Sequence, residues 1–319
     1  MKHQHSIPLV GSLFIAVIFF QQLFFVNVPF TAELPDVYVG IDVAYDDFSA
    51  IKDLIDDVNS FTNLFVIGCT GITYDERKLD ETCQYLFDRD FFFIIYSEIS
   101  PRTQWIETAQ NKWGDRFLGF YAFDEVGGRQ LDRSELIVKQ ADNFADASNE
   151  FDLRMTGWLN WFTRNYPNSV SPTLFTSDYA LYWFDYKAGY DVLLAQFGWN
   201  YSRQLNVALC RGAAEVQNRS WGVIITWTYN SPPYIGSGEE LYNDLVLAYD
   251  NGAKYILIFD SNKAYTNGIL DDEHLDALQQ FWTYVKENPR TNGLQNKRVA
   301  YVLPADYAYG FRGPDDKIW

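Results

Sequence analysis

The sequence of 319 residues contains very little histidine. It holds three histidines, and His3 and His5 lie close to the N-terminus, so that His274 alone remains for the rest of the chain. A Ser-His-Asp or Cys-His mechanism, or a zinc site with several histidines, would have to be built around that single residue. We therefore set these chemistries aside and look for chemistry that carboxylates can perform.

Basic residues and cysteines are also scarce. Lysine and arginine total 25 against 42 acidic residues, which gives a net charge of -17. Such a surface repels phosphate backbones, so we expect no nucleic-acid partner. The three cysteines, Cys69, Cys83 and Cys210, form no C-x-x-C pattern, and we expect buried free thiols, no metal site and no cofactor. A Cys69–Cys83 pair is the alternative, although Cys83 falls at a core position of a predicted helix.

A long apolar segment opens the chain. Ile7 to Val28 is interrupted only by Gln21 and Gln22, and about 20 such residues can cross a bilayer. We predict an uncleaved signal-anchor over residues 1–32, with a cleaved signal peptide or a buried core helix as alternatives. Either export signal would place the remainder outside the cytoplasm, tethered to the cell membrane or secreted.

Short apolar runs then alternate with helical patterns. The predicted strands begin near residues 37, 64, 91 and 117, and this spacing is the length of one β-loop-α-loop unit. The second half is less regular, with further strands predicted at 174–176, 192–197, 222–227 and 255–259. We expect a long helix over about 133–151, and the pattern leaves the class of the aromatic segment 158–166 open.

This alternation predicts a single α/β domain. Eight parallel strands, each followed by a helix, close into a (β/α)8 TIM barrel, which we place at residues 33–296 behind the single N-terminal apolar helix. An open doubly wound sheet would usually carry a glycine-rich turn after its first strand, and the stretch Asp42 to Asp46 lacks one. Residues 297–319 begin with the apolar run Arg298 to Pro304, which predicts an extra strand or the start of an accessory domain.

Acidic residues stand at the ends of five predicted strands. In TIM barrels the site is assembled at the carboxyl ends of the strands and in the loops that follow them. The acids there are Asp42, Glu98, Asp124 with Glu125, Asp178 and Asp260. Each has a structural alternative, since Asp42 or Asp260 could cap the following helix. We predict Glu125, Asp124, Asp178 and Asp260 as catalytic candidates, and Asp42, Glu98 and Gln196 as substrate-binding candidates.

The most specific local pattern is the end of the fourth strand. The apolar run Gly119 to Phe123 ends in Asp124-Glu125, followed by Val126 and two glycines. Adjacent acids repel each other unless one is protonated, and burial would raise the pKa of Glu125 toward that of a general acid. Neighbours on an extended strand point to opposite sides, so both acids reach the lumen only if the chain bends. We expect Gly127-Gly128 to supply that bend.

Aromatic residues are abundant, with 25 Phe, 22 Tyr and 10 Trp. Sugar rings present flat C–H faces that stack on indole and phenol rings, while carboxylates accept hydrogen bonds from hydroxyl groups. Trp199, Trp227, Tyr229 and Tyr234 follow the sixth and seventh predicted strands. We predict that they stack on a bound sugar; simple packing within the barrel is the alternative.

The barrel pattern with an acid pair after strand four resembles (β/α)8 glycoside hydrolases, many of which place their general acid there. Asp124-Glu125-Val126 is similar to the pair of the β-N-acetylhexosaminidases, in which the glutamate protonates the leaving oxygen and the aspartate orients the acetamido group that acts as nucleophile. That family precedes the pair with His-x-Gly-Gly, whereas Ala122-Phe123 stands here. The acid that retaining barrel glycosidases carry at strand seven is also missing, which puts ordinary double displacement in doubt.

These patterns together predict an extracytoplasmic, membrane-tethered glycoside hydrolase-like barrel that acts on oligo- or polysaccharides by carboxylate acid/base chemistry. Two alternatives remain open. The missing strand-seven acid favours a non-catalytic surface module that binds a glycan or a partner protein through the same mouth. A metal-dependent hydrolase could use Asp42, Glu125, Asp178, Asp260 and His274, with one histidine suiting only magnesium or calcium.

Overall fold

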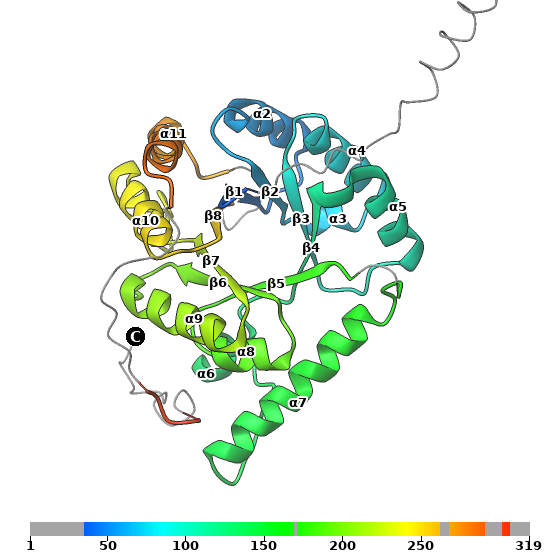
Figure 1. Cartoon of the computed structure of the whole chain (residues 1–319), viewed down its shortest axis with the longest axis vertical. Coiled ribbons are helices and arrows are strands. Elements are labelled where there is room, and N and C mark those ends of the chain that lie inside the picture. The colour runs from blue at the N-terminus through cyan, green and yellow to red at the C-terminus, as the bar shows by residue number, and fades with distance from the viewer. Residues whose placement is uncertain (1–34, 169–170, 262–267, 291–301, 307–319) are drawn as a thin grey trace, which may run out of the picture. The chain divides into compact units, whose positions relative to one another are not determined.

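Eight parallel strands close into a barrel in the computed structural model, which describes residues 35–168, 171–261, 268–290 and 302–306 (Figure 1). The strands are β1 (Tyr38–Val43), β2 (Leu64–Ile67), β3 (Phe92–Ser97), β4 (Phe117–Ala122), β5 (Thr173–Asp178), β6 (Val192–Phe197), β7 (Ser220–Ile225) and β8 (Tyr255–Asp260). Each strand pairs with the next, and β8 pairs with β1. The prediction of a TIM barrel is confirmed, and the open sheet is excluded.

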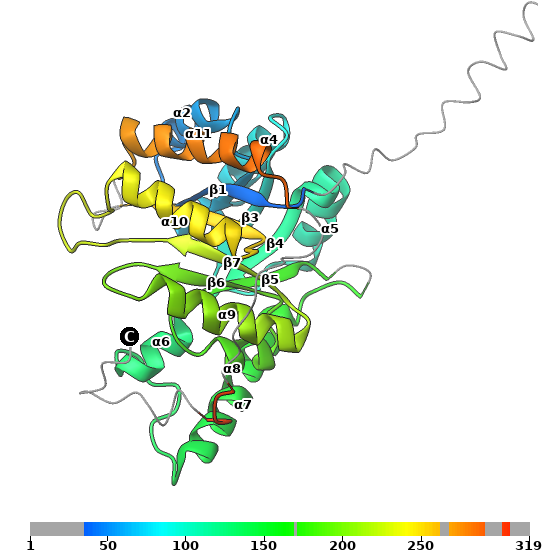
Figure 2. The same cartoon turned by 60° about the vertical axis from the view of Figure 1, so that its left-hand side comes forward.

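Helices surround the strands (Figure 2). They are α2 (Phe48–Val58), α3 (Thr70–Thr73), α4 (Glu76–Phe87), α5 (Thr103–Trp113), the 3₁₀ helix η1 (Gly114–Arg116), α6 (Val126–Asp132), α7 (Phe144–Thr163), α8 (Tyr182–Ala188), α9 (Arg203–Gln217), α10 (Gly238–Asp250) and α11 (Asp272–Glu287). Acids and serines that precede several helices cap them: Asp47, for example, accepts the N–H groups of Ser49 and Ala50. Within the described ranges, no helix is long and apolar enough to cross a membrane.

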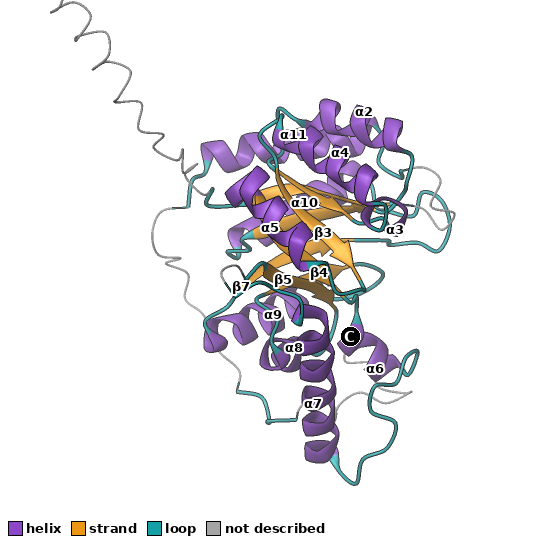
Figure 3. Cartoon of the chain, turned by 90° about the vertical axis from the view of Figure 1, so that its right-hand side faces the viewer, coloured by secondary structure: helices purple, strands orange, loops and turns teal. Residues whose placement is uncertain are grey.

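The connection between β4 and β5 differs from the prediction. Helix α6 ends at Asp132, and Arg133 follows in the left-handed conformation with φ 59°. Helix α7 begins only at Phe144, where the Asn143 side chain accepts the N–H of Asp146. The predicted helix over 133–151 is therefore wrong for its first eleven positions, and the aromatic segment is helical as far as residue 163. Figure 3 shows α7 as a long helix beside α8, running past the barrel.

Two predictions at the chain ends fall largely outside the described residues. The apolar segment 1–32 lies there entirely, as does the run 298–301 of the predicted extra strand. The remainder of that run, residues 302–304, is described and has no regular structure, and Val302 is 98% exposed. All three cysteines are free, so the Cys69–Cys83 pair does not form, and Cys83 and Cys210 are buried as expected.

Alternation along the strands builds two hydrophobic layers. In β1, Val39, Ile41 and Val43 pack outward against the helices, while Tyr38 joins an inner cluster that fills the barrel. This inner cluster includes Tyr255, whose ring stacks on Tyr38 with centroids 4.9 Å apart. Side chains of successive residues point to opposite faces of a strand. The alternation therefore determines which residue at each strand end faces the interior of the barrel.

Candidate active site

A cavity of about 880 Å³ lies at the carboxyl ends of the strands, where TIM barrels carry their sites. Among the predicted residues, it is lined by Asp42, Glu98, Asp124, Glu125, Gln196, Trp199 and Trp227. Further lining residues include Asp46, Tyr96, Tyr121, Ser177, Thr226 and Phe259. The structure thus brings most of the predicted residues together at one mouth. Asp178, Asp260, Tyr229 and Tyr234 are not among the lining residues.

Strand alternation separates the predicted acids into two groups. In β5, Ser177 lines the cavity and its neighbour Asp178 does not; in β8, the same holds for Phe259 and Asp260. Asp42 occupies an inward position of β1 and does line the cavity. The two outward acids therefore face the layer between strands and helices, although all three are almost fully buried.

Asp178 accepts hydrogen bonds from the backbone. Its carboxylate receives the N–H groups of Gly127 at 2.6 Å, Gly128 at 2.8 Å, Tyr179 at 2.6 Å and Ala180 at 3.0 Å. These bonds tie the first turn of α6 to the end of β5. The geometry gives Asp178 a positioning role behind the acid pair of strand four.

Asp260 is occupied in a similar way. Its carboxylate accepts the N–H groups of Ile269 at 2.6 Å and Leu270 at 3.2 Å, and the hydroxyl of Tyr45 at 3.3 Å. Its oxygens therefore bind the chain ahead of α11 and the loop after β1. The structure brings neither Asp178 nor Asp260 into contact with the cavity.

The chain bends at the acid pair through non-glycine residues. Phe123 and Glu125 adopt positive φ angles of 55° and 54° on either side of Asp124, a conformation that is uncommon for side-chain-bearing residues and concentrates at functional sites. Asp124 and Glu125 both line the cavity because of this bend.

Gly127 and Gly128, which we expected to supply the bend, instead lie in helix α6. A Cβ on Gly127 would come within 2.6 Å of the Asp178 Oδ2 atom, and one on Gly128 within 2.2 Å of the Tyr179 ring. Glycine is required at both positions because the helix approaches strand five closely. Our explanation of the two glycines was therefore wrong.

Asp124 is held by hydroxyl groups. The Tyr121 hydroxyl donates to its Oδ1 atom, and Ser177 Oγ donates to the same atom at 2.7 Å. Arg129 donates to the backbone oxygen of Asp124 and pairs with Glu135 at 2.7 Å. Burial raises the pKa of Asp124, and the bonds from Tyr121 and Ser177 oppose that rise. The carboxylate is thereby fixed in orientation.

Glu125 receives one hydrogen bond, from Gln196 Nε2 to its Oε1 atom. Burial, followed by the charge of Asp124, raises the pKa of Glu125 to about 7. A carboxyl with such a pKa exchanges its proton near neutral pH, which general acid catalysis requires. The N–H of Glu125 also donates to the Ser177 carbonyl oxygen at 3.1 Å, so the backbone of the pair is anchored to β5.

Asp42 is the most unusual acid of the cavity. It is 4% exposed, and its Oδ1 atom has no hydrogen-bond partner among the described residues. Burial raises its pKa well above the ordinary value, and the charges of Asp124 and Asp260 add to the effect. Gly68 leaves room for it, since a Cβ there would lie 2.1 Å from that oxygen.

Two tryptophans form an aromatic wall. The rings of Trp199 and Trp227 meet at 81° with centroids 6.4 Å apart, and Trp227 Nε1 donates to the Ser261 carbonyl oxygen at 2.9 Å. Tyr234 packs on Trp227 with centroids 6.0 Å apart without lining the cavity. Tyr229 is 44% exposed and also lies outside the lining.

Sequence reasoning missed Tyr96 and Tyr121. Both are inward residues of their strands, and both hydroxyls bind acids of the cavity: Tyr96 donates to Glu98 Oε1 at 2.8 Å, and Tyr121 to Asp124. Their strands are buried on both faces and carry no polar alternation that would have pointed to them. Ser97, whose hydroxyl binds the Ile99 carbonyl oxygen, does not line the cavity.

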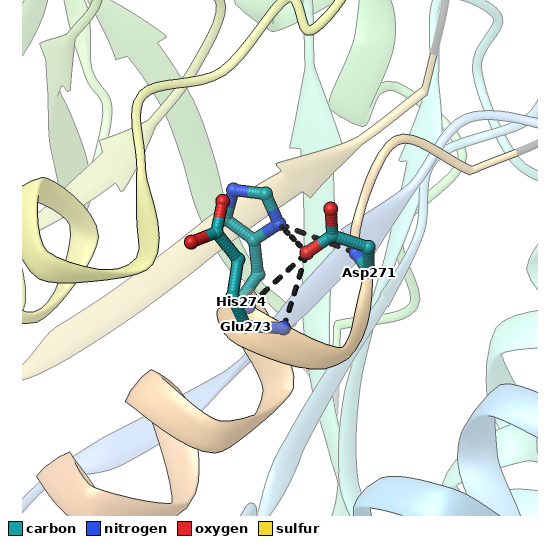
Figure 4. Close-up of side chains that lie close together, drawn as sticks. All are labelled: Asp271, Glu273 and His274. Carbon is teal, nitrogen blue, oxygen red and sulfur yellow. Dashed lines mark hydrogen bonds and ion pairs between the residues drawn. The ribbon is translucent and has the colours of Figure 1, made fainter.

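One group of possible metal ligands occurs in the described part of the chain, at the start of α11 (Figure 4). Asp271 accepts the N–H groups of Glu273 and His274, and His274 Nδ1 lies 2.7 Å from the Asp271 carboxylate. His274 Nε2 is bonded to the Gly236 carbonyl oxygen at 2.8 Å. This is a helix cap. Within the described residues, His274 and the four acids of the metal-dependent alternative do not converge on one ion site.

No family model matches the sequence, and no curated protein matches it. Solved structures do resemble the barrel. A β-1,4-D-mannanase from Cryptopygus antarcticus aligns with a TM-score of 0.52 and 11% identity over 82% of this chain and 94% of that chain. A GH5-4 broad-specificity endoglucanase from an uncultured bacterium aligns with a TM-score of 0.49 and 9% identity over 78% of this chain and 94% of that chain. A 3-hexulose-6-phosphate synthase from Salmonella typhimurium aligns with a TM-score of 0.44 and 8% identity over 78% of this chain and 99% of that chain. Identities this low show the barrel fold alone, which several enzyme classes share.

Proposed function

We propose that the barrel is a glycoside hydrolase that cleaves glycans by carboxylate acid/base chemistry. The observation that carries the proposal is the acid pair Asp124-Glu125, turned into the cavity by a bend that only its own strained backbone provides. A pair of carboxyl groups in different environments is the arrangement that glycosidic bond cleavage uses.

Glu125 is the general acid in this proposal. With a pKa of about 7, a substantial fraction of it is protonated at neutral pH and can donate to the leaving glycosidic oxygen. Gln196 fixes the Oε1 atom by its amide, which leaves the other carboxyl oxygen to carry the proton. Gln196 is therefore a positioning residue for the acid.

Asp124 is the second carboxylate. Strand β7 and the following residues 226–237 contain no acid, so a nucleophile at strand seven is excluded. Asp124, oriented by Tyr121 and Ser177, would instead direct the attacking group, either a water molecule or a substituent of the sugar.

The aromatic wall supports a sugar as the bound molecule. Trp199 and Trp227 both line the cavity, with their rings at 81° to each other, and indole rings can stack on the flat faces of sugars. A volume of about 880 Å³ falls in the range of small-molecule sites and can hold a short oligosaccharide.

We also propose that the protein acts outside the cytoplasm, tethered by residues 1–32. The support is the apolar sequence from Ile7 to Val28. A tethered protein should pellet with membranes and resist carbonate extraction. A soluble form that begins near Ala32 or Glu33 would show a cleaved signal peptide instead.

A non-catalytic barrel that binds a glycan or a partner protein through the same cavity is the second candidate, favoured by the missing acid at strand seven. The full-length protein should be screened for hydrolysis and binding with a panel of aryl glycosides and oligosaccharides. Turnover that Glu125→Gln abolishes while binding survives supports the hydrolase. Glycan or protein binding by the wild type without any turnover supports the binding module.

A further inference from the structure

The cavity carries charge of one sign only. Its described lining includes five acids, which are Asp42, Asp46, Glu98, Asp124 and Glu125, and neither lysine nor arginine. Arg129 lies behind the pair, where it binds the Asp124 backbone oxygen and Glu135. A carboxylate, sulfate or phosphate group on a ligand would therefore meet repulsion without compensation. This lining disfavours acidic glycans as ligands.

A second observation is independent of the charge count. Asp42 and Gln196 are each 4% exposed and line the cavity, and each has a side-chain oxygen without a hydrogen-bond partner among the described residues. Buried acceptors without donors are costly, and they are retained where a ligand supplies the missing donors. Both oxygens can therefore accept hydrogen bonds from a ligand that carries N–H or O–H donors.

We propose that the cavity binds an amino glycan, with the protonated amine of one sugar seated among Asp42, Asp124 and the neighbouring aromatic rings. This inference rests on the proposed function and specifies its substrate class. An ammonium group brings three N–H donors and a positive charge to a site that holds carboxylates and no cation. The rings of Tyr96 and Tyr121, which lie 5.5 Å apart at 85°, add a cation–π surface.

Binding of an ammonium group should change the protonation of Asp42. Burial and the neighbouring acids raise its pKa, which favours the neutral carboxyl in the ligand-free protein. A nearby ammonium group favours the ionised form. Binding should therefore change the number of bound protons, and calorimetry in buffers of different ionisation enthalpy should detect that change for amino glycans alone.

An oligolysine peptide would offer the same ammonium chemistry. The glycan is favoured because Trp199 and Trp227 also line the cavity, and flat indole faces suit sugar rings. The experiment must therefore include a peptide arm.

The test compares three β-1,4-linked hexasaccharides that differ only at C2: glucosamine, N-acetylglucosamine and glucose oligomers. Binding to the full-length protein is measured by calorimetry, with hexalysine as a fourth ligand. We expect the glucosamine oligomer to bind about tenfold more tightly than the other two sugars, as expected of one added charge-assisted contact. That preference should weaken as the salt concentration rises.

Two variants separate the site from overall charge. Asp42→Asn should lower the affinity for the glucosamine oligomer about tenfold and abolish its preference over the glucose oligomer. Asp57→Asn, which removes one exposed acid on α2, changes the net charge equally and should retain the preference. Circular dichroism is the folding control, and both variants should give the spectrum of the wild type.

Each outcome has a separate meaning. Equal affinities, or a preference for the acetylated or glucose oligomer, overturn the amino-glycan inference, while turnover of those sugars would still uphold the hydrolase. Hexalysine binding more tightly than the glucosamine oligomer overturns it in favour of a peptide site. Amino-glycan binding without hydrolysis upholds the inference and contradicts the hydrolase. Absence of binding by all four ligands contradicts both.

Discussion

Carboxylates at the same end of the barrel lie in two different environments, one facing the surrounding helices and one facing the cavity. The outward acids Asp178 and Asp260 have their oxygens occupied, by four backbone N–H groups in one case and by two plus a tyrosine hydroxyl in the other. Of the inward acids, Asp42 has a carboxyl oxygen without a hydrogen-bond partner among the described residues. Glu125 receives a hydrogen bond from the Gln196 amide. The carboxyl oxygens of the outward acids are thus occupied by hydrogen bonds within the protein, whereas the inward acids can still accept hydrogen bonds from a ligand.

The difference shows that acids at the same end of the barrel can serve either to hold the backbone in place or to exchange protons. Backbone donors stabilise an ionised carboxylate, so an outward acid holds a loop in place. Burial raises the pKa of acids in both groups, but backbone N–H groups oppose that rise only for Asp178 and Asp260. Glu125, with a pKa of about 7, can exchange its proton near neutral pH. Replacing members of each group should therefore produce effects of different kinds, in stability for one and in activity for the other.

The largest expected effect concerns Glu125. Glu125→Gln removes the proton donor and keeps the shape, and turnover should fall about 10²–10⁴-fold, the usual contribution of a positioned general acid. Steady-state kinetics on an aryl glycoside measures it. Glu107→Gln, an exposed glutamate of α5, is the matched control and should leave the rate unchanged. Equal rates for the two variants would end the assignment of Glu125 as the acid.

Asp178→Ala should affect stability most. It removes the acceptor of the Gly127, Gly128 and Tyr179 N–H groups, and unpaired buried donors cost about 1–3 kcal/mol each. We expect the free energy of unfolding to fall by about 3–5 kcal/mol, in line with the loss of a buried polar network. Urea denaturation measures this loss. A variant as stable as the wild type would remove the distinction between outward and inward acids.

Gly128→Ala tests the close approach of α6 to strand five. The added Cβ would lie 2.2 Å from the Tyr179 ring, and such overpacking costs about 1–3 kcal/mol. Gly157→Ala is the control, because a Cβ there meets nothing within 4 Å; it should stabilise helix α7 by up to about 1 kcal/mol. Thermal denaturation should shift the two variants in opposite directions, and a shift in the same direction would contradict the packing argument.

The pH dependence follows from the raised pKa of Glu125. The acid must be protonated to act, so kcat/KM on an uncharged aryl glycoside should decline above about pH 7, by about tenfold per pH unit. The fold favours the protonated form, so the contribution of Glu125 to stability is full below the ordinary carboxyl pKa. It is lost as the pH rises through about 7. Activity that stays constant up to pH 9 would contradict this assignment.

Asp42→Asn should have the smallest effect on stability. The replaced carboxyl already has an oxygen without a hydrogen-bond partner, so no protein bond is lost and a buried ionisable group is removed. We expect the free energy of unfolding to change by about 1 kcal/mol or less. A loss comparable to that of Asp178→Ala would show that Asp42 has a structural role of its own.

The fold was predictable because each strand is a short apolar run, and the strand positions agree closely in both halves. Because the strands are apolar throughout, however, the sequence does not show which side chains at the strand ends face the interior of the barrel. Strands buried on both faces lack the polar alternation that would reveal which residues face inward. Sequence reasoning therefore placed Asp178 and Asp260 with Asp42 and overlooked Tyr96 and Tyr121.

The bend at the acid pair was beyond sequence reasoning for another reason. A positive φ at Phe123 and Glu125 has no signature in these residue types, whereas the nearby glycines suggested flexibility. Their actual requirement depends on Asp178 and Tyr179, which lie about 50 residues further along the chain. Contacts of this kind depend on the tertiary fold and leave no local pattern.

The anchoring of the strand-four bend to strand five has an evolutionary consequence. Glu125 N–H binds the Ser177 carbonyl oxygen, and Gly127 and Gly128 bind Asp178, so the acid pair is fixed by the strand that follows the long excursion. The intervening chain, which includes α7, takes no part in these bonds. Insertions, deletions or exchange of that excursion should therefore leave the acid pair in place, which makes the excursion an interchangeable module beside a fixed acid pair.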